Sequence, residues 1–510
     1  MITRRLIRWT DDRVGGTSFT RKSLDKVFPD HWSFMLGEVA MYCLVVLIAT
    51  GVFLTFFFHA SSQDVIYTGS FLPLRGQHMS EAYRSVVQLG FDVRAGLLIR
   101  QIHHWAALVF LGAIVLHLCR IFFTAAYRKP REINWFIGLT LMLLAIANGF
   151  TGYSLPDDLL SGTGLRIAYS ILLSVPVIGA SLAYLIFGGE FPANDITSRL
   201  YVIHVLIVPA LIIGLLSVHL AVVWRQKHTQ FSGPGRTEHN VVGSRLWPTY
   251  ALRSLGLLFT VLAVLVALGG LFQINPIWLY GPFVPSSVST AAQPDWYMGW
   301  LEGALRLFPS FKVHLFGYRV PEVILPAVVF PSLTFLALFS WPAIDRRISA
   351  RNGEAVDVEH HLLVRPRDRP RRTAFGVAVL SFYVVLFIGG GQDIIAQKFK
   401  LGIDDVRAAV RIMLIAVPVA AGAFTWKLCR DLATERREQR SNDSVRPTEN
   451  GAQRQDEHRR TADLDRASGA AASAPAASKK TNVAGRLGLA LAVTVAAVAT
   501  SRWRKRQTGF

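Results

Sequence analysis

Eight apolar stretches, most of them about 20 residues long, limit what this chain can fold into. An α-helix rises about 1.5 Å per residue, so about 20 apolar residues cross the hydrocarbon core of a bilayer. Hydrophobic residues make up 52% of the 510 residues and charged residues only 17%, a balance that is unusual for a soluble protein. The sequence therefore predicts an all-α polytopic membrane protein whose eight spans are Phe34–Phe58, Ile102–Phe123, Ile133–Tyr153, Val202–Val223, Leu255–Ile274, Val320–Trp341, Phe375–Gly389 and Val406–Leu428.

The net charge of +20 is distributed over alternate loops rather than over one surface. Basic residues gather in the N-terminal segment, in the tail, and in the loops after the second, fourth and sixth spans, for example Arg128, Lys129, Arg236, Arg346 and Arg347. Cytoplasmic loops of membrane proteins carry such an excess of Lys and Arg. We therefore expect a multi-pass protein of the plasma membrane with both termini in the cytoplasm, in contact with lipid and not with nucleic acid.

A ninth apolar stretch, Ile167–Phe187, contains Pro176 and several glycines. If it crossed the bilayer, the basic loops after the fourth and sixth spans would lie outside while the earlier basic loops stayed inside. The loop that holds it, residues 154–198, carries Asp157, Asp158, Glu190 and Asp195 but only Arg166 as a cation, as an external loop should. We therefore expect Ile167–Phe187 to lie folded on the outer face.

Four histidines occupy two of the predicted spans at matched depths. His103 and His117 are 14 residues apart in the second span, and His204 and His219 are 15 apart in the fourth. At 100° per residue each pair stays on one helix face, with its members roughly 21 to 23 Å apart along the axis. Pro209 should kink the fourth span, which can absorb the extra residue.

These two spans run in the same direction, because one span lies between them. His103 then faces His204 near the outer surface, and His117 faces His219 near the inner one. Two imidazoles that face each other across a helix bundle are typical axial ligands of a low-spin haem, so the spacing predicts two haems. His104 points about 100° away from the ligand face.

Other residues fit a haem at each level. Arg100 and Arg120 each lie three positions outside a histidine of the second span, where they could pair with haem propionates. A spacing of 14 residues recurs in two glycine pairs of the first and third spans, which leaves room for a flat macrocycle: Gly37 with Gly51, and Gly138 with Gly152. Snorkelling at helix ends and small-residue helix packing are the ordinary explanations of such arginines and glycines.

Short motifs around these histidines carry a family resemblance. They are R-x-x-H ending at His103, H-x-x-R starting at His117, "GYSLPDDLLSGTGLR" at 152–166, and "QPDWY" at 293–297. Together they resemble cytochrome b of the respiratory cytochrome bc complexes, over about residues 20–430. The stretch "RQKHTQFSGPGRTEHNVVG" after the fourth span is similar to the actinobacterial branch of that family.

The resemblance implies eight helices, two non-covalent b-type haems and two quinone sites. His103 and His204 would hold the low-potential haem, and His117 and His219 the high-potential haem. Quinol, menaquinol by the branch resemblance, would be oxidised at the outer site. One electron would pass to an iron–sulfur protein and cytochrome c, and the other through both haems to a quinone at the inner site, with proton translocation. Implied partners are a Rieske iron–sulfur protein, a cytochrome c subunit, a second copy of the chain and a terminal oxidase.

The resemblance also assigns the outer quinol site to the "PDWY" motif. Asp295 would be the proton-accepting carboxylate, where most family members carry Glu. The surrounding residues would be Pro294, Trp296 and Tyr297 of the motif, with Tyr153, Pro156 and Gly162 to Gly164 as the opposite wall. Trp296 and Tyr297 could instead be ordinary interfacial aromatics.

The inner site departs from the family pattern. The family usually has a Lys–Asp pair near the start of the fifth span, and the matching residues here are Arg253 and Ser254. The proton-delivering carboxylate is therefore missing at that place, and we expect proton uptake by another route. Lys227, His228 and Glu238 are possible substitutes, although ordinary cytoplasmic loop charge is the better explanation of them.

The chain divides by composition into five segments. Residues 1–31 form a cytoplasmic segment, 32–230 a di-haem domain, and 231–430 a second membrane domain with the "PDWY" loop. Residues 431–482 are polar and low in complexity, which predicts disorder. Residues 483–510 hold a short apolar run with a basic end, typical of an interfacial helix.

Three alternatives stay open. Membrane histidines can relay protons in a channel or transporter, which would show no haem spectrum. A different di-haem anchor could pass quinol electrons to a dehydrogenase, although four or five helices would suffice for it. A diverged paralogue could bind both haems with weak turnover, as the changes at Asp295 and Ser254 allow.

Overall fold

The structure is a computed structural model that describes residues 5, 9, 11–13, 16–287, 293–315 and 317–445. Its contacts divide the chain into two compact units, Met1–Arg436 and Arg437–Phe510. Both predicted membrane domains lie in the first unit, to which the following description refers. The apolar run within 483–510 lies outside the described residues.

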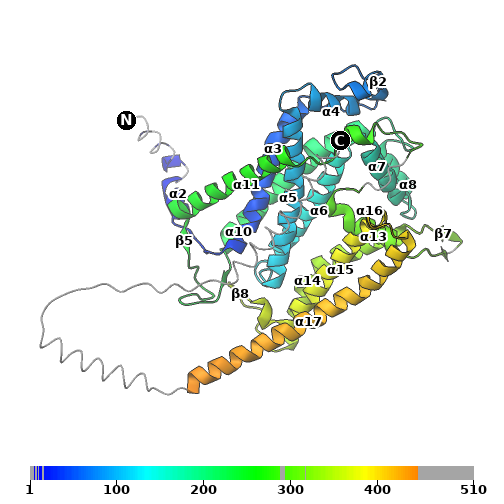
Figure 1. The fold of residues 1–510 in the computed structure, drawn as a ribbon. Coiled ribbons are helices and arrows are strands. Elements are labelled where there is room, and N and C mark those ends of the chain that lie inside the picture. Colours follow the sequence, from blue (N-terminus) through cyan, green and yellow to red (C-terminus); the bar gives the residue numbers. More distant parts are fainter. Residues whose placement is uncertain are drawn as a thin grey trace, which may run out of the picture. The chain divides into compact units, whose positions relative to one another are not determined.

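The eight predicted membrane spans are confirmed as long apolar helices (Figure 1). A helix satisfies its own backbone groups, so it is the form that an apolar chain can take in lipid. The helices are α3 (Leu36–Thr55), α5 (Gly96–Phe123), α6 (Glu132–Tyr153), α9–η3–α10 (Ile196–Val202, Ile203–Ile207, Val208–Gln226), η4–α11 (Leu246–Tyr250, Ala251–Leu271), η6–α14 (Leu325–Val329, Phe330–Arg351), α15 (Pro370–Gly390) and α17 (Ile403–Val445).

Shorter elements connect these helices. The short helices are α2 (Gly16–Leu24), α4 (Glu81–Phe91), α7 (Leu159–Leu173), α8 (Gly179–Phe187), α12 (Ile277–Tyr280), α13 (Gly299–Leu307) and α16 (Gln392–Phe399), with single turns η1 (Trp32–Phe34), η2 (Leu72–Leu74), η5 (Trp296–Met298) and η7 (Pro366–Asp368). The strand pairs are β1 (Val27–Phe28) with β5 (Ser244–Arg245), β2 (Asp64–Ile66) with β3 (His78–Ser80), and β6 (Val313–Leu315) with β7 (Tyr318–Val320), all antiparallel, and β4 (Gln230–Phe231) parallel to β8 (Leu362–Leu363).

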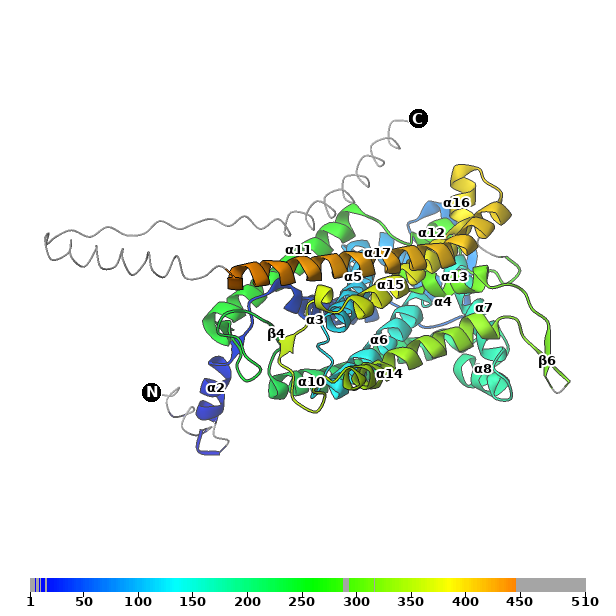
Figure 2. The same cartoon turned by 90° about the horizontal axis from the view of Figure 1, so that it is seen from below.

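The helices form two groups (Figures 1 and 2). In the first, α3 packs on α5, α11 packs on both, and α6 packs on α10. In the second, α13, α15, α16 and α17 share one apolar cluster. Helix α14 joins the groups, since Trp135 Nε1 of α6 donates a hydrogen bond of 2.9 Å to the Leu338 carbonyl. The histidine-bearing helices α5 and α9–α10 therefore lie inside the first group.

The ninth apolar stretch does not form one span. It divides between α7 and α8, which pack on each other as a hairpin. The break falls at Pro176 and Val177, and Val177 has a left-handed φ of 67°. Proline has no amide hydrogen to continue the helix, which explains why the two pieces stay short. The folded arrangement predicted for Ile167–Phe187 is thus observed.

The connecting loops meet in two sets. The N-terminal segment pairs with the loop after α10 through β1 and β5, and that loop pairs with the loop after α14 through β4 and β8. These are the basic loops. At the other end, the Tyr83 hydroxyl of α4 donates to the Ile277 carbonyl at 3.1 Å, and Asp158 forms a backbone bridge with Pro282. The basic loops are thus joined to one another, and the acidic loop that holds α7 and α8 belongs to the other set.

The extra residue between His204 and His219 is taken up by a π-helical turn. This turn, η3, covers Ile203–Ile207, and the Val208 amide donates to the Ile203 carbonyl five residues back. A π turn inserts one residue into an α-helix, and Pro209 just after it has no amide hydrogen of its own. The 15-residue spacing therefore still presents both histidines to α5.

Helix α17 continues to Val445, into the segment from 431 for which composition predicts disorder. Residues 431–445 contain neither Gly nor Pro and are rich in Glu, Arg and Gln. Such residues have high helix propensity, so a polar segment can prolong the helix that precedes it.

Candidate functional site

The outer histidines face each other across the first helix group. The ring centroids of His103 and His204 lie 6.3 Å apart, with the rings tilted by 72°. A metal–imidazole bond of about 2 Å, with about 1 Å more from the nitrogen to the ring centre, places two axial ligands about 6 Å apart. The distance therefore fits one iron between the two rings.

Both outer imidazoles are oriented through their Nδ1 atoms. His103 Nδ1 lies 2.9 Å from Thr50 Oγ1, and the same hydroxyl donates to the Val46 carbonyl at 2.6 Å. His204 Nδ1 lies 3.0 Å from the Asn148 carbonyl, to which it can donate. With Nδ1–H bonded in this way, Nε2 of each ring is left as a metal ligand.

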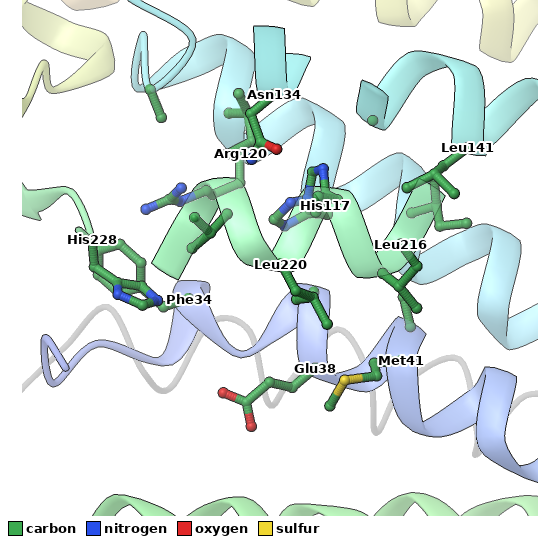
Figure 3. Close-up of a pocket in the computed structure, with 18 of the residues that line it drawn as sticks. Phe34, Glu38, Met41, His117, Arg120, Asn134, Leu141, Leu216, Leu220 and His228 are labelled. Atoms are coloured by element: carbon green, nitrogen blue, oxygen red, sulfur yellow. The ribbon is translucent and has the colours of Figure 1, made fainter. Parts of the chain in front are cut away.

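The inner histidines line a cavity of about 420 Å³ (Figure 3). His117 of α5 and His219 of α10 stand on its wall with apolar residues such as Leu141 and Leu216. The Nδ1 atoms of both histidines are buried and have no hydrogen-bond partner among the described residues. The cavity thus offers an apolar space beside two unsatisfied imidazoles, which a haem would fill.

The four predicted glycines each lie against one of the four histidines. A Cβ atom would come within 3.3 Å of His117 at Gly37, 3.3 Å of His103 at Gly51 and 3.6 Å of His219 at Gly138. At Gly152 it would lie 2.3 Å from His204 Cε1, which is a clash. The glycines therefore make room for the imidazole rings themselves.

The two arginines of α5 have unused hydrogen-bond donors. Arg100 donates to the Asn275 carbonyl at 3.2 Å, but its second terminal nitrogen is buried and unpaired in the described part of the chain. Arg120 lies 4.3 Å over the Phe34 ring, and its Nε is likewise buried without a described partner. Buried guanidinium donors of this kind fit the carboxylates of a haem.

At the outer end, Asp295 is paired with the second histidine of the "HH" sequence. His104 Nε2 lies 2.8 and 2.9 Å from the two carboxylate oxygens, and the side chains are only 15% and 10% exposed. The sequence placed His104 off the ligand face but did not find this pairing. An imidazole in an apolar span needs a polar partner, so the position of His104 within a span could have indicated that such a partner exists.

The two aromatic residues of the "PDWY" motif lie in turn η5. Tyr297 is 4% exposed, whereas Trp296 is 37% exposed. Burial, followed by the neighbouring Asp295 carboxylate, raises the pKa of the Tyr297 phenol well above its usual value. Tyr297 thus remains a neutral hydrogen-bonding group at physiological pH.

Helix α7 and the residue before it contact the loop after α12. Asp158 caps α7 through a reciprocal arrangement with Ser161. A Cβ at Gly162 would lie 2.1 Å from the Phe283 ring, and one at Gly164 would lie 3.5 Å from Tyr153. Burial raises the pKa of Asp157, next to the cap, to about 6. Glycines in α7 therefore allow the two loops to approach closely.

At the inner end, the two residues at the family's Lys–Asp position separate. Ser254 lines the cavity, whereas Arg253 pairs with Asp30 at 2.6 Å on the exposed side. The cavity also contains Glu38 of α3, whose carboxylate oxygens accept hydrogen bonds from the Tyr250 and Ser254 hydroxyls. Glu38 escaped the sequence analysis, although an acid inside a predicted span is itself a signal of function.

The remaining inner candidates take different positions. Lys227 and His228 line the cavity. Burial, followed by Lys26, Arg120 and Arg131, lowers the pKa of His228 to about 4. Glu238 instead accepts hydrogen bonds from the backbone amides of His361 and Leu362, and so joins the loop after α10 to the loop after α14.

Comparisons with known proteins identify relatives of the whole chain. The family described as "Cytochrome b(N-terminal)/b6/petB" matches residues 108–282. The cytochrome bc1 complex cytochrome b subunit of Streptomyces coelicolor is 49% identical over 429 residues, which cover 84% of this chain and 78% of that protein. The subunit of the same name from Mycobacterium tuberculosis is 48% identical, covering 85% and 77%. That of Corynebacterium diphtheriae is 47% identical, covering 84% and 78%.

A solved structure has the same fold. A chain of a "Hyperthermophilic respiratory Complex III" aligns with a TM-score of 0.61 over 82% of this chain and 98% of its own length, at 19% identity. Eight membrane-spanning helices in this arrangement define a cytochrome b fold. At nearly half identity over most of its length, this chain belongs to the family of cytochrome b subunits of the cytochrome bc1 complex.

Proposed function

We propose that the chain is the di-haem cytochrome b subunit of a proton-translocating quinol:cytochrome c oxidoreductase. Family membership makes it a component of such an enzyme. The finer proposal is that His103 with His204, and His117 with His219, each hold one b haem. Quinol, menaquinol by the branch resemblance, would be oxidised at the outer site, and quinone reduced at the inner one.

The observation that carries this proposal is the outer histidine pair. Its 6.3 Å separation fits one iron between the rings, and the contacts of the two Nδ1 atoms with Thr50 and Asn148 leave the Nε2 atoms as the metal ligands. A proton relay does not require two histidine rings that face each other with both Nδ1 atoms held by hydrogen bonds. A bound haem supplies one-electron transfer between the outer and inner sites.

At the outer site the residues of the chain supply proton chemistry. Oxidation of a quinol to a quinone releases two electrons and two protons. Asp295 is buried at the edge of that site and is the carboxylate that takes one of the protons from a quinol hydroxyl. His104 holds both carboxylate oxygens and so fixes the direction in which Asp295 can accept.

The loop contacts support the orientation in the membrane. The basic loops are joined through β1–β5 and β4–β8, and an excess of Lys and Arg favours the cytoplasmic side. We therefore place these loops and both termini in the cytoplasm, with α7, α8 and the Asp295 site outside. The outer face is then where a Rieske iron–sulfur protein and a cytochrome c subunit would dock. Self-association and contact with a terminal oxidase are part of the same proposal.

Haem quantitation on the purified complex tests the proposal. We expect two b haems per chain and a reduced-minus-oxidised spectrum of b type. A colourless chain would favour a transporter, and a single haem would exclude the transmembrane electron path.

Turnover then separates an active subunit from a diverged paralogue. Quinol:cytochrome c activity should fall by about 100-fold or more in Asp295→Asn, as for removal of a general base. Asp295→Glu, which restores the residue that most family members carry, is the matched control and should retain activity. Unchanged turnover in Asp295→Asn would remove Asp295 from its proposed role.

A further inference from the structure

The inner cavity contains a carboxylate that comes from a different helix than the family pattern indicates. Ser254 occupies the family's aspartate position, so the fifth span brings no acid to the cavity. Glu38, in the first turn of α3, is the only Asp or Glu among the described residues that line it. Gly37, its neighbour, lies against the ring of His117. The acid therefore lies one residue beyond the glycine that contacts the inner histidine.

Hydroxyl groups hold the Glu38 carboxylate at the edge of the cavity. Tyr250 donates to one carboxylate oxygen and Ser254 to the other, while the Tyr42 hydroxyl lies 2.5 Å from Ser254 Oγ. In Figure 3 the carboxyl group points away from His117. The haem would occupy the space at the inner histidines, and a quinone would approach the acid on its own side of the cavity, beside Tyr250 and Ser254.

We infer that Glu38 is the proton donor of the inner quinone site and replaces the carboxylate that is absent at Ser254. This inference rests on the proposed function. The substrate class is a quinone whose carbonyl oxygen approaches the Glu38 carboxyl group. Ser254 and Tyr250 act as positioning residues that bind the carboxylate when it has lost its proton.

The reaction balances as follows. A quinone takes up two electrons and two protons, and each C=O becomes a C–OH group. The electrons arrive one at a time from quinol oxidation at the outer site. Glu38 gives one proton to the nearer carbonyl oxygen, becomes a carboxylate held by Tyr250 and Ser254, and is reprotonated from cytoplasmic water. The second carbonyl oxygen takes its proton from water directly.

Several charged and titratable groups surround this acid and would shape any pH dependence. They come from every element that lines this part of the cavity or touches the acid: Tyr42 of α3, Arg120 and His117 of α5, Arg131 before α6, His219 of α10, Lys227 and His228 after α10, Tyr250 of η4, and the Asp30–Arg253 pair at the rim. Among the described residues that line the cavity, the cations Arg120, Arg131 and Lys227 outnumber the acid Glu38, so a carboxylate formed in turnover is electrostatically tolerated there.

The experiment uses the purified complex with its outer site closed by Asp295→Asn. The complex is reduced with dithionite and desalted, and its b haems are then oxidised by an added soluble quinone in a stopped-flow spectrometer. Glu38→Gln should slow this oxidation about tenfold or more, as expected when a general acid is lost, and should remove its dependence on pH. Glu38→Asp should recover part of the rate. Asp30→Asn is the control, since Asp30 is an exposed acid at the same end that bonds Ser244 and Arg253.

Infrared redox-difference spectra give a readout that does not depend on turnover. A carboxyl band should appear on quinone reduction in the parent and in Asp30→Asn, vanish in Glu38→Gln, and shift in Ser254→Ala. Oxidation rates and bands in Glu38→Gln that equal those of Asp30→Asn would overturn the inference. If Glu38→Gln loses the inner haem, the carboxyl band of Ser254→Ala tests the inference instead. An unshifted band in Ser254→Ala would overturn the inference. Absence of both haems in the parent would instead refute the proposed function.

Discussion

The two ends of the histidine bundle share a ligand pattern but differ in their surroundings. At the outer end, both imidazoles are oriented by hydrogen bonds to Thr50 and Asn148. At the inner end, neither Nδ1 atom has a partner among the described residues, and the histidines open onto a cavity of about 420 Å³. A similar difference separates the acids, since Asp295 is paired with His104, whereas Glu38 is bound by hydroxyl groups.

This difference shows how one repeated motif can serve two purposes. A hydrogen bond at Nδ1 fixes the ring and raises its basicity as a ligand, which favours the more positive charge state of the metal. In the proposed function, the contacts of the chain itself make the outer ligands the more basic pair, and the inner haem would hold an electron more readily. An electron would therefore move from the outer to the inner pair, in the direction that quinone reduction requires.

The largest effect, on haem content, is expected when each of the two neighbouring histidines of α5 is replaced in turn. His103→Leu should reduce the b haem content from two per chain to one, because an axial ligand is lost. His104→Leu should keep both haems, because His104 faces Asp295 instead. Pyridine haemochrome analysis measures the content. Equal loss in both variants would show that the two histidines have no separate roles.

A smaller loss is expected when the glycines beside the histidines are replaced. A Cβ at Gly152 would lie 2.3 Å from His204, but one at Gly138 would lie 3.6 Å from His219. Gly152→Ala should therefore displace the outer ring at a cost of about 1–3 kcal/mol and lower outer haem occupancy. Gly138→Ala should be tolerated. Thermal release of haem from the two purified variants makes the comparison, and a more labile Gly138→Ala would contradict it.

A third prediction concerns the hydrogen bond between Thr50 and His103 at the outer end, which has no counterpart among the described residues at the inner end. Thr50→Val removes the acceptor of His103 Nδ1, which should make the outer haem potential more positive and weaken haem binding about tenfold. Thr50→Ser keeps the hydroxyl and should behave as the parent. Potentiometric titration reports both haems at once. The inner potential should stay unchanged, and a shift of both haems would point to a general distortion of α3.

The smallest effect is expected from a polar cluster at the outer end. Arg306 binds both Glu302, at 2.5 Å, and Asp393, at 2.8 Å, and burial raises the pKa of Glu302 to about 7. Because this pKa is raised above the ordinary 4.5, ionisation of Glu302 destabilises the fold as pH rises from about 4.5 to about 7. Glu302→Gln should therefore gain about 1 kcal/mol relative to the parent between pH 5 and pH 8, a value reduced for solvent screening. Thermal unfolding of the complex at both pH values measures this gain. A relative gain toward acid pH would reverse the sign and refute it.

Much of the fold follows from local rules that act along a single segment. The length and composition of each apolar run determine that it is a span, and helical periodicity determines that His103 and His117 share a face. Glycine at 14-residue intervals follows the same rule. The segment from 431 shows the limit of composition, since α17 continues to Val445 where low hydrophobicity alone predicts disorder.

Only the tertiary structure decided which side chains meet across helices. His104 and Asp295 are 191 positions apart, and Glu38 and Tyr250 are 212 apart. Spacing along one helix sets the depth and direction of a side chain, but the partner depends on which helix packs opposite and how far it is rotated. For this reason the sequence by itself determined eight spans and two matched histidine pairs. Helix packing decided that Asp295 lies against an imidazole, and that the inner acid comes from the first span.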